Sequence, residues 1–279
     1  MRGDSGRMID LARKLSQMDW KKVEEDAIQF IAATVSEAKA EGVVLGLSGG
    51  IDSSIVVTLC VKALGKENVL GLYMPVAFTP ANDQDDAKAI AEDLGIRTHL
   101  IPIGQIVDKF LEIVPMKEKN RVAVGNLFAR MRMVANYCVA NSMNYLVSGT
   151  GDRSEILIGY FTKYGDGGAD FLPIGHLYKT QVRELAKHLG LPSRIANKPA
   201  SPQLWKGQRA TDEIPIDYPI LDQVLHGLFD IKMSAGDVAK ELNIPLKVVE
   251  TVQRFHERSR HKRTIPPVPS IPQELLRRS

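Results

Sequence analysis

Short apolar runs alternate along the chain with longer stretches whose apolar residues have helical spacing. Asp19 is typical of a helix N-cap, and the residues after it up to Gly42 show that spacing, at Val23, Ala27, Phe30, Ile31, Thr34 and Val35. Residues 43–47 form a short apolar run that ends in Ser-Gly-Gly, and residues 53–64 follow as a helical stretch closed by Gly65. The pattern predicts a helix, a strand, a glycine turn and a second helix.

The same order returns further along the chain. Apolar runs at 69–74, 96–101 and 145–147 predict strands, and helical stretches lie between them at 83–94, 106–114 and 121–142. This alternation predicts an α/β fold, a doubly wound parallel sheet in a three-layer α/β/α arrangement. Ligands of such sheets bind beyond the carboxyl ends of the strands. The glycine turn and the loop Ser148-Gly149-Thr150-Gly151 both lie at that edge.

The remainder of the chain is less regular. Residues 159–169 are rich in turn formers, 178–189 have helical spacing, and 199–215 contain three prolines and few apolar residues. We expect 199–215 to be a mobile loop long enough to act as a lid. Residues 218–258 read as helical with breaks near Ser234 and Pro245, and four later prolines exclude regular structure in the tail. No internal repeat or composition shift divides the chain, so we expect one domain over residues 1–279.

Composition narrows the class of protein. The chain has 279 residues, of which 44% are hydrophobic and 25% charged, as in ordinary globular proteins. No apolar stretch reaches the ~18 residues of a membrane span, and residues 1–9 lack the apolar run of a secretory signal. We therefore expect a cytoplasmic protein with no membrane contact. Cys60 and Cys138 lie in apolar, helical segments without CxxC spacing, which predicts small core residues.

Charge gives little indication of a macromolecular partner. The net charge is +3, too small to indicate nucleic-acid binding by itself. A basic run occupies the C-terminal part, and an acidic patch contains Asp83, Asp85 and Asp86. Charge runs are usually solvated faces, which is the interpretation we adopt for both.

The most informative residues are Gly46-Leu47-Ser48-Gly49-Gly50-Ile51-Asp52-Ser53-Ser54, placed between a predicted buried strand and a helix. Glycines let backbone N–H groups approach an anion, and the helix N-terminus adds unpaired donors and a positive dipole end. The segment lacks the lysine of GxxxxGK[ST] and is not GxGxxG. Asp52 stands where that lysine would be, and a carboxylate beside phosphates needs a bridging metal. We therefore predict a phosphate loop with Asp52 as a magnesium ligand.

This loop resembles the pyrophosphate loop of the N-type ATP pyrophosphatases, which grip the β- and γ-phosphates of ATP as a leaving group. Four further segments, with the late pair His261-Lys262, closely resemble the ammonia-dependent NAD synthetases: residues 125–133, 149–155, 159–170 and 177–182. The similarity runs from about Asp19 to Pro267. It implies the adenine nucleotide α-hydrolase-like form of the predicted fold.

The resemblance implies the last step of NAD biosynthesis. The nicotinate carboxylate of deamido-NAD attacks the α-phosphorus of ATP, pyrophosphate leaves, and ammonia displaces AMP. Asp52 and Glu155 would hold Mg²⁺, with Lys179 near the phosphates and Asp166 near ammonia as further catalytic residues. ATP would contact Gly46, Leu47, Ser48, Gly49, Gly50, Ile51, Asp52, Ser53, Thr150, Lys179 and Ser201. Deamido-NAD would contact Arg130, Lys163, Asp170, His261 and Lys262.

The same residues could also have purely structural roles. An acidic residue such as Glu155 favours a helix N-terminus on its own. Arg130 and Arg132 fit the exposed side of an amphipathic helix, and the pair His261-Lys262 fits a solvated tail. Lys163 and Asp170 flank a loop with more glycines than a structural turn needs, which favours close approach of a ligand.

The resemblance also bears on the oligomeric state of the protein and on the source of the nitrogen. The helix around 127–139 has apolar residues on more than one face, and the resembling family forms homodimers with deamido-NAD at the interface. Glutamine-dependent relatives carry an extra amidase domain with a catalytic cysteine, for which this sequence has neither the length nor a suitably placed cysteine. We therefore expect ammonia to be the nitrogen donor, unless a separate subunit delivers it. The alternatives are a tRNA-thiolating or lysine-ligating relative, which usually needs cysteine pairs or a basic RNA-binding domain, and a nucleotide-binding module without chemistry. Asp52 together with Glu155 argues against mere binding.

Overall fold

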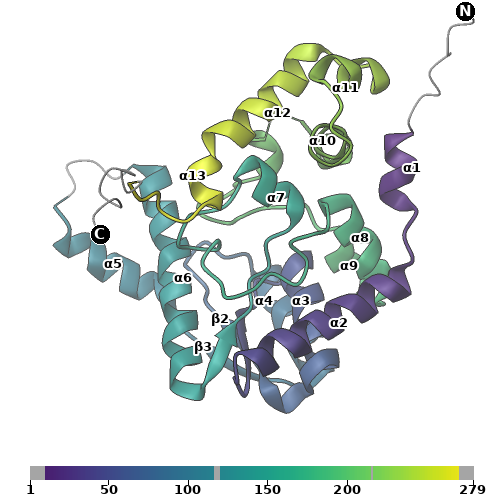
Figure 1. Cartoon of the computed structure of the whole chain (residues 1–279). Coiled ribbons are helices and arrows are strands. Elements are labelled where there is room, and N and C mark those ends of the chain that lie inside the picture. The colour runs from purple at the N-terminus through teal and green to yellow at the C-terminus, as the bar shows by residue number, and fades with distance from the viewer. Residues whose placement is uncertain (1–9, 116–119, 215, 270–279) are drawn as a thin grey trace, which may run out of the picture.

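A computed structural model of the chain describes residues 10–115, 120–214 and 216–269. At its centre lies a parallel sheet, of which Figure 1 labels β2 and β3. The strand order is β3-β2-β1-β4. The strands are β1 (Gly42–Gly46), β2 (Val69–Tyr73), β3 (Arg97–Leu100) and β4 (Tyr145–Val147). The expected doubly wound parallel sheet in three layers is confirmed.

Helices cover both faces of the sheet. On one face pack α2 (Trp20–Glu37), α3 (Ile51–Leu64), α4 (Ala81–Leu94) and α8 (Lys179–His188), and on the other α5 (Ile103–Ile113) and α6 (Arg121–Met143). Val43 and Leu45 of β1 belong to the first core and Val44 to the second, and all three are fully buried. A strand buried on both faces reads as a continuous apolar run, which is why β1 was visible in the sequence.

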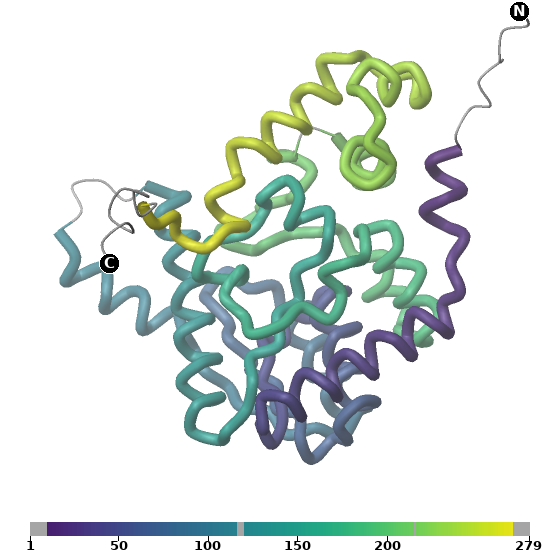
Figure 2. Tube along the Cα trace, in the orientation of Figure 1, coloured from purple at the N-terminus to yellow at the C-terminus, as the bar shows by residue number. Residues whose placement is uncertain are grey.

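The C-terminal part adds a helical layer with a core of its own. It contains α10 (Tyr218–Leu225), the π-helical turn η3 (His226–Asp230), α11 (Ala235–Glu241), α12 (Leu246–Arg258) and α13 (Arg260–Arg263). Ser234 and Pro245 are the N-caps of α11 and α12, so both predicted breaks are confirmed. Figure 2 shows the yellow end of this layer returning beside the teal segment around α7 (Arg153–Ile158).

Several short elements were not predicted. They are α1 (Leu11–Ser16), α9 (Ser193–Ala196) and the 3-10 turns η1 (Lys66–Asn68) and η2 (Ala210–Asp212). Three long helices begin two or three residues before the predicted start, after Gly50, Pro80 and Pro102. The earlier start of α3 puts Asp52 in its first turn. Asp19 caps α2 as expected, accepting a hydrogen bond from the backbone N–H of Lys22 at 3.1 Å.

The two cysteines differ. Cys60 is buried, and burial raises the pKa of its thiol to about 12. Cys138 is exposed, so the prediction of a core residue was wrong there. It lies on α6, which packs only one side against the sheet.

The strand order sets the position of the site. From β1 the chain proceeds to β2 and β3 on one side, while β4 pairs with the other side of β1. The switch point of the sheet therefore lies between β1 and β4. The predicted phosphate loop follows β1, and the loop 148–151 follows β4. Among the described residues, no helix is both long and apolar enough to cross a bilayer.

Candidate active site

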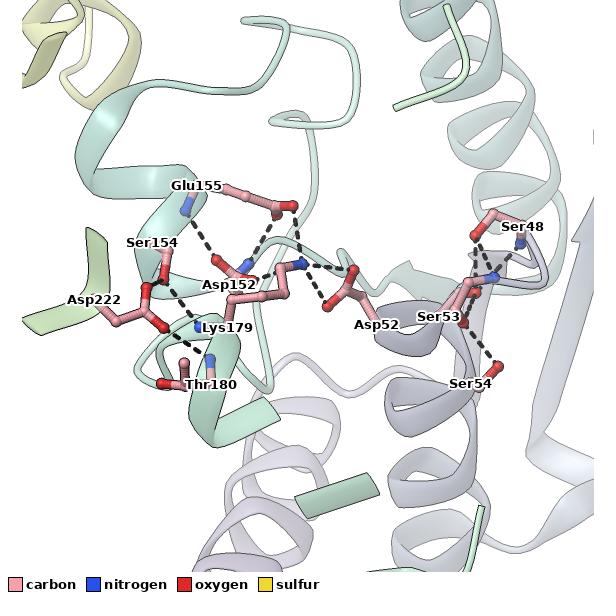
Figure 3. Close-up of polar contacts among 11 residues, drawn as sticks. Ser48, Asp52, Ser53, Ser54, Asp152, Ser154, Glu155, Lys179, Thr180 and Asp222 are labelled. Atoms are coloured by element: carbon pink, nitrogen blue, oxygen red, sulfur yellow. Dashed lines mark hydrogen bonds and ion pairs between the residues drawn. The ribbon is translucent and has the colours of Figure 1, made fainter. Parts of the chain in front are cut away.

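The loop between β1 and α3 has the geometry of an anion cradle. Gly49 has φ of +72°, and a Cβ there would lie 2.0 Å from the Asp83 carbonyl oxygen, so only glycine fits. The Ser48 and Ser53 hydroxyls lie 3.0 Å apart, and the Gly50 N–H donates to the Ser48 hydroxyl at 3.2 Å (Figure 3). Helix α3 begins directly behind with no side-chain cap, so its first N–H groups stay available to a ligand.

Beside this loop, three carboxylates surround one ammonium group. Lys179 Nζ lies 2.9 Å from both Asp52 oxygens, 2.7 Å from Asp152 Oδ2 and 3.1 Å from Glu155 Oε1 (Figure 3). Lys179 and Asp152 are fully buried, whereas the Asp52 and Glu155 side chains keep 24% and 21% of their surface. The carboxylates come from α3 and α7, which follow different strands, and the lysine starts α8.

The cluster has more negative than positive charge. Its three carboxylates and one ammonium leave a formal charge of −2. Burial and the neighbouring carboxylates raise the pKa of Glu155 well above its usual value, and burial, opposed by Lys179, raises that of Asp152. Burial lowers the pKa of Lys179, but the three carboxylates outweigh it and hold the lysine charged. A further cation would relieve this excess.

The residues present fit a magnesium ion. Asp52 and Glu155 line the cavity and supply carboxylate oxygens, the ligands Mg²⁺ prefers, and about a fifth of each side chain stays accessible beside the bond to Lys179. Within residues 10–115, 120–214 and 216–269, no group of three or more His, Cys, Asp or Glu forms a complete metal site. Mg²⁺ usually takes one or two carboxylates and completes its shell with water and substrate phosphates.

A buried network fixes the cluster from behind. The Ser154 hydroxyl donates to Asp222 Oδ1 at 2.6 Å and accepts from the Lys179 N–H at 2.9 Å. Asp222 Oδ2 accepts from the Thr180 N–H at 2.8 Å, so one carboxylate joins the starts of α7 and α8 (Figure 3). Asp152 caps α7 in a capping box with Glu155. The two helix starts that supply the charged groups are therefore held together.

One large cavity opens above these groups. Its volume is about 1600 Å³, above the ~300–1,000 Å³ of a typical small-molecule site. It is lined by most of the predicted site residues: Gly46, Leu47, Ser48, Gly50, Ile51, Asp52, Thr150, Glu155, Lys163, Asp166, Ser201 and Lys262. Gly49, Ser53 and Lys179 lie directly behind this lining, bonded to Lys198, Ser48 and the carboxylates.

The predicted dinucleotide contacts divide into two groups. Lys262 Nζ donates to the Gly159 and Phe161 carbonyls at 2.7 Å each, and Lys163 Nζ donates to the His261 and Thr264 carbonyls. These two lysines thus join the C-terminal tail to the glycine-rich loop. The interpretation of a solvated basic tail is wrong for Lys262, whose ammonium is bound at the cavity wall.

Arg130, Asp170 and His261 are not among the residues that line the cavity. Asp170 accepts from the Tyr137 hydroxyl at 2.9 Å and from the Val147 N–H at 2.7 Å, which anchors the loop to β4. Arg130 donates to the Lys163 carbonyl at 3.4 Å, and His261 is exposed. Direct contact of these three with a ligand stays a prediction.

Asp166 lies in the cavity on the glycine-rich loop and accepts a hydrogen bond from the Thr162 N–H at 2.8 Å. Its side chain is accessible to solvent inside the cavity. The surrounding protein nevertheless removes part of its hydration, and this desolvation raises the pKa of Asp166 above the usual value. Arg132 faces the same space, and burial lowers its pKa to about 10. Arg132 is therefore part of the cavity wall and not simply an exposed residue of an amphipathic helix.

Sequence reasoning missed three features of the site. Asp152 was not assigned, although its spacing from Glu155 is the capping-box signal. Lys198 contacts the phosphate loop and was not noticed, because nothing in its surroundings marks it. The acidic patch was interpreted as solvated, but Asp83 and Asp86 are buried and paired, and of the three only Asp85 is exposed.

Comparison with known proteins adds independent evidence. The profile of the family described as NAD synthase matches residues 23–266. The NH(3)-dependent NAD(+) synthetase of Hyperthermus butylicus is 50% identical over 258 residues, which span 92% of this chain and 93% of that protein. The protein of the same description from Archaeoglobus fulgidus is 48% identical over 255 residues, 91% of this chain and 98% of its own length.

Solved structures show the same similarity. The NH3-dependent NAD synthetase from Campylobacter jejuni has a TM-score of 0.77 and 33% identity, and the match covers 91% of this chain and 100% of that chain. NMN synthetase from Francisella tularensis has a TM-score of 0.79, also with 33% identity and the same coverage. The names of these two enzymes differ in the product, NMN or NAD.

Proposed function

The chain belongs to the NAD synthase family, and from this premise we propose that it amidates deamido-NAD with ammonia in the cavity above the sheet, using ATP and magnesium. A carboxylate cannot lose oxide to ammonia, so it must first acquire a better leaving group. The nicotinate carboxylate oxygen forms a bond to the α-phosphorus of ATP, and the bond to pyrophosphate breaks. The nitrogen of ammonia then attacks the acyl carbon, AMP leaves with the bonding pair, and the nitrogen loses its extra proton.

The observation that best supports this proposal is the convergence of two features on one cavity. The glycine loop at 46–50 offers N–H donors for phosphate oxygens, and the Asp52 and Glu155 carboxylates lie beside it. We place the β- and γ-phosphates on the loop. Magnesium held by Asp52 and Glu155 would neutralise charge that gathers on the phosphates during transfer. Lys179 keeps these two carboxylates together within 3.1 Å of one nitrogen.

The tail and the glycine-rich loop are the proposed walls for deamido-NAD. Lys163 and Lys262 hold residues 159–163 against residues 261–264, and both lysines line the cavity. Asp166 lies on the same wall. We place ammonia there, where a carboxylate stabilises ammonium or accepts its proton. The expected cytoplasmic location stays a prediction.

The size of the cavity favours a dinucleotide over a mononucleotide as the acid. About 1600 Å³ leaves room for a second nucleotide beside ATP. The curated relatives with the higher identities, 50% and 48%, are described as NAD synthetases, whereas the NMN synthetase from Francisella tularensis is 33% identical. The mononucleotide acid is therefore the second candidate substrate.

We also propose a homodimer. Helix α5 exposes Ile106, Phe110 and Ile113, which are 44%, 44% and 73% accessible and share one face by their i, i+4, i+7 spacing. Helix α6 exposes Val122 and Val134 as well, at 54% and 50%. Large exposed apolar faces of this kind mark protein interfaces. A second copy of the chain is the partner that the resemblance implies.

The test is to incubate the purified protein with ATP, MgCl₂, ammonium chloride and either deamido-NAD or nicotinate mononucleotide. NAD, AMP and pyrophosphate should form in equal amounts, and deamido-NAD should have the higher kcat/KM. Absence of NAD and pyrophosphate over a wide range of substrate concentrations would refute the proposed reaction. A higher kcat/KM for the mononucleotide would assign the second candidate instead.

The magnesium site has its own test in Asp52→Ala. Loss of this carboxylate should lower kcat by at least ~100-fold, the scale for losing a main electrostatic stabiliser. It should also weaken the binding of Mn²⁺ in the presence of ATP, as measured by electron paramagnetic resonance. Asp85→Ala is the control, because Asp85 is an exposed acidic residue of α4 outside the cavity lining. A rate near that of the wild type in Asp52→Ala would show that the metal is held elsewhere.

A further inference from the structure

Asp83 and Asp86, the two buried carboxylates of α4, form a charge network with Lys198 and Arg194 beside the phosphate loop. Lys198 Nζ lies 2.8 Å from Asp83 Oδ1, 2.6 Å from Asp86 Oδ2 and 2.7 Å from the Gly49 carbonyl oxygen. Arg194 Nε pairs with the other Asp86 oxygen at 2.6 Å. Two carboxylates and two cations therefore balance, and one of the cations reaches the backbone of the loop.

We propose that Lys198 is a positioning residue that orients the peptide unit between Gly49 and Gly50 for phosphate binding. The proposal rests on the function proposed above, in which this loop holds the ATP phosphates. In this role Lys198 does not itself contact the nucleotide. Its role is to hold the Gly49 carbonyl group so that the Gly50 N–H group, on the opposite side of the same peptide, faces the ligand.

The geometry of the peptide bond supports this role. The described residues contain no cis peptide bond, so the Gly49 carbonyl and the Gly50 N–H point in opposite directions. With the carbonyl held by Lys198, the Gly50 N–H points to the Ser48 hydroxyl, and Gly50 and Ser48 both line the cavity. Glycine has no Cβ to resist rotation of this peptide. The loop therefore needs an external contact to keep one orientation.

A direct role in binding phosphate is the obvious alternative for a lysine beside such a loop. An ammonium group has three N–H donors, and Lys198 uses them on Gly49, Asp83 and Asp86. Its charge is already balanced by buried carboxylates, whose side chains are each 9% accessible. Although Lys198 lines the cavity, its three donors are therefore all engaged in this structure and its charge is paired, which favours a positioning role over direct phosphate binding.

The same network also contacts residues 199–214 of the cavity wall. Gln203 Nε2 donates to Asp83 Oδ2, and Asp83 also lies against Gly49, where no side chain would fit. Lys198 itself directly precedes residues 199–214, which line the cavity through Ser201, Gln203 and Trp205. The phosphate loop is therefore connected through this network to residues 199–214 of the cavity wall.

The test compares ATP with AMP, which lacks the β- and γ-phosphates. In Lys198→Met we expect the Kd for ATP, measured by isothermal titration calorimetry, to rise about tenfold to a hundredfold, the range for a lost hydrogen bond to a charged group. The Kd for AMP should change less than about threefold, within the usual effect of surface substitutions. The KM for ATP should rise in parallel while the KM for deamido-NAD does not.

Arg194→Met is the matched control, because it removes the other cation of the network without touching Gly49. It should leave the Kd for ATP within about threefold of the wild type. Lys198→Arg keeps the charge and tests the contact if the methionine variant does not fold. We expect this variant to stay folded and still to bind ATP more weakly, because a guanidinium does not reproduce the three directions of the ammonium.

Three results would overturn the inference: equal losses of ATP affinity in Arg194→Met and Lys198→Met, parallel losses for ATP and AMP, or unchanged ATP affinity in the lysine variants. None of them bears on whether the wild type makes NAD. An inactive wild type that still shows the ATP-specific loss would contradict the proposed reaction and leave the role of Lys198 intact.

Discussion

Asp222 is a fully buried carboxylate behind the charged cluster. In the part of the chain that the structure describes, no cation lies within ion-pair distance of it, and its acceptors are used by the Ser154 hydroxyl and the Thr180 N–H. Burial raises its pKa to about 6, against the lowering effect of these hydrogen bonds. The native state therefore favours the protonated form more than the unfolded chain does.

This difference predicts a pH dependence of stability. Because the native pKa is raised from 3.8 to about 6, the native state binds the extra proton between these values, and stability falls as pH rises through them. Asp222→Asn removes this titration, so the wild type should lose up to about 3 kcal/mol relative to the variant between pH 4 and pH 7. Urea unfolding at several pH values measures the difference.

Asp217→Asn is the control for this experiment, because Asp217 is exposed and makes no cap hydrogen bond at the start of the same helix. Its stability should follow that of the wild type at each pH. A constant difference between the wild type and Asp222→Asn over the whole range would show that Asp222 does not titrate there.

Single site residues were predictable where the signal is local. Asp52 lies within a glycine-rich loop and Glu155 starts a helix after a strand, so both positions follow from a few neighbouring residues. Lys198 could not be predicted, because its partners Gly49 and Asp86 are more than one hundred residues away along the chain. The burial of Asp83 and Asp86 depends on that same distant lysine.

At the scale of elements, the segment 199–214 is the least regular part of the cavity wall. It is closed on itself, since the Ser201 hydroxyl donates to the Gln208 carbonyl at 2.6 Å and the Leu204 N–H donates to Gln208 Oε1 at 2.8 Å. Trp205 stacks under Arg121 of α6, with 4.6 Å between guanidinium carbon and ring centre. Its expected mobility stays a prediction.

If this segment is a lid, ATP with Mg²⁺ should slow its cleavage by trypsin at Lys206 or Arg209, both exposed residues. Limited proteolysis followed by mass spectrometry gives the rate at each bond. Cleavage at exposed Lys247 of α12, away from the cavity lining, is the internal control and should not change. Equal rates at Lys206 and Arg209 with and without nucleotide would contradict closure.

The strands and the longer helices were predictable because each shows either a continuous apolar run or a repeating apolar pattern. The strands β1 and β2 and the helices α2, α3, α4 and α6 were expected close to their observed positions. The short helices α1 and α9 were not, since six and four residues are too few to show a period. Three helix starts were predicted late, although Ile51 and Ile103 at the observed starts of α3 and α5 are buried apolar residues that follow directly after Gly50 and Pro102.

At the scale of the whole molecule, α5 and α6 carry several of the large apolar side chains that are exposed in the described part of a single chain. Replacement of Ile106 and Phe110 together by Glu should convert the proposed dimer into a monomer, because charged side chains would be buried at the interface. Analytical ultracentrifugation measures the change in mass. The kcat/KM for deamido-NAD should fall as well if the substrate site spans two copies.

Leu246→Glu is the control, because Leu246 is 45% accessible and lies on α12, in a different layer. It should leave both mass and activity unchanged. A wild type that sediments as a monomer at the concentrations of the activity assay would contradict the proposed assembly, and a dimeric double variant would place the interface elsewhere.

The contacts of the C-terminal tail also determine when the site can form during translation of the chain. Lys262 and Arg263 donate hydrogen bonds to carbonyl groups of residues 156–161, so the wall of the cavity depends on residues that are made more than one hundred positions after β4. A nascent chain with β1 to β4 outside the ribosome would have its phosphate loop but not this wall. Such a chain would be unable to close the site around a substrate, and it gains this capacity only when residues 262 and 263 have also emerged.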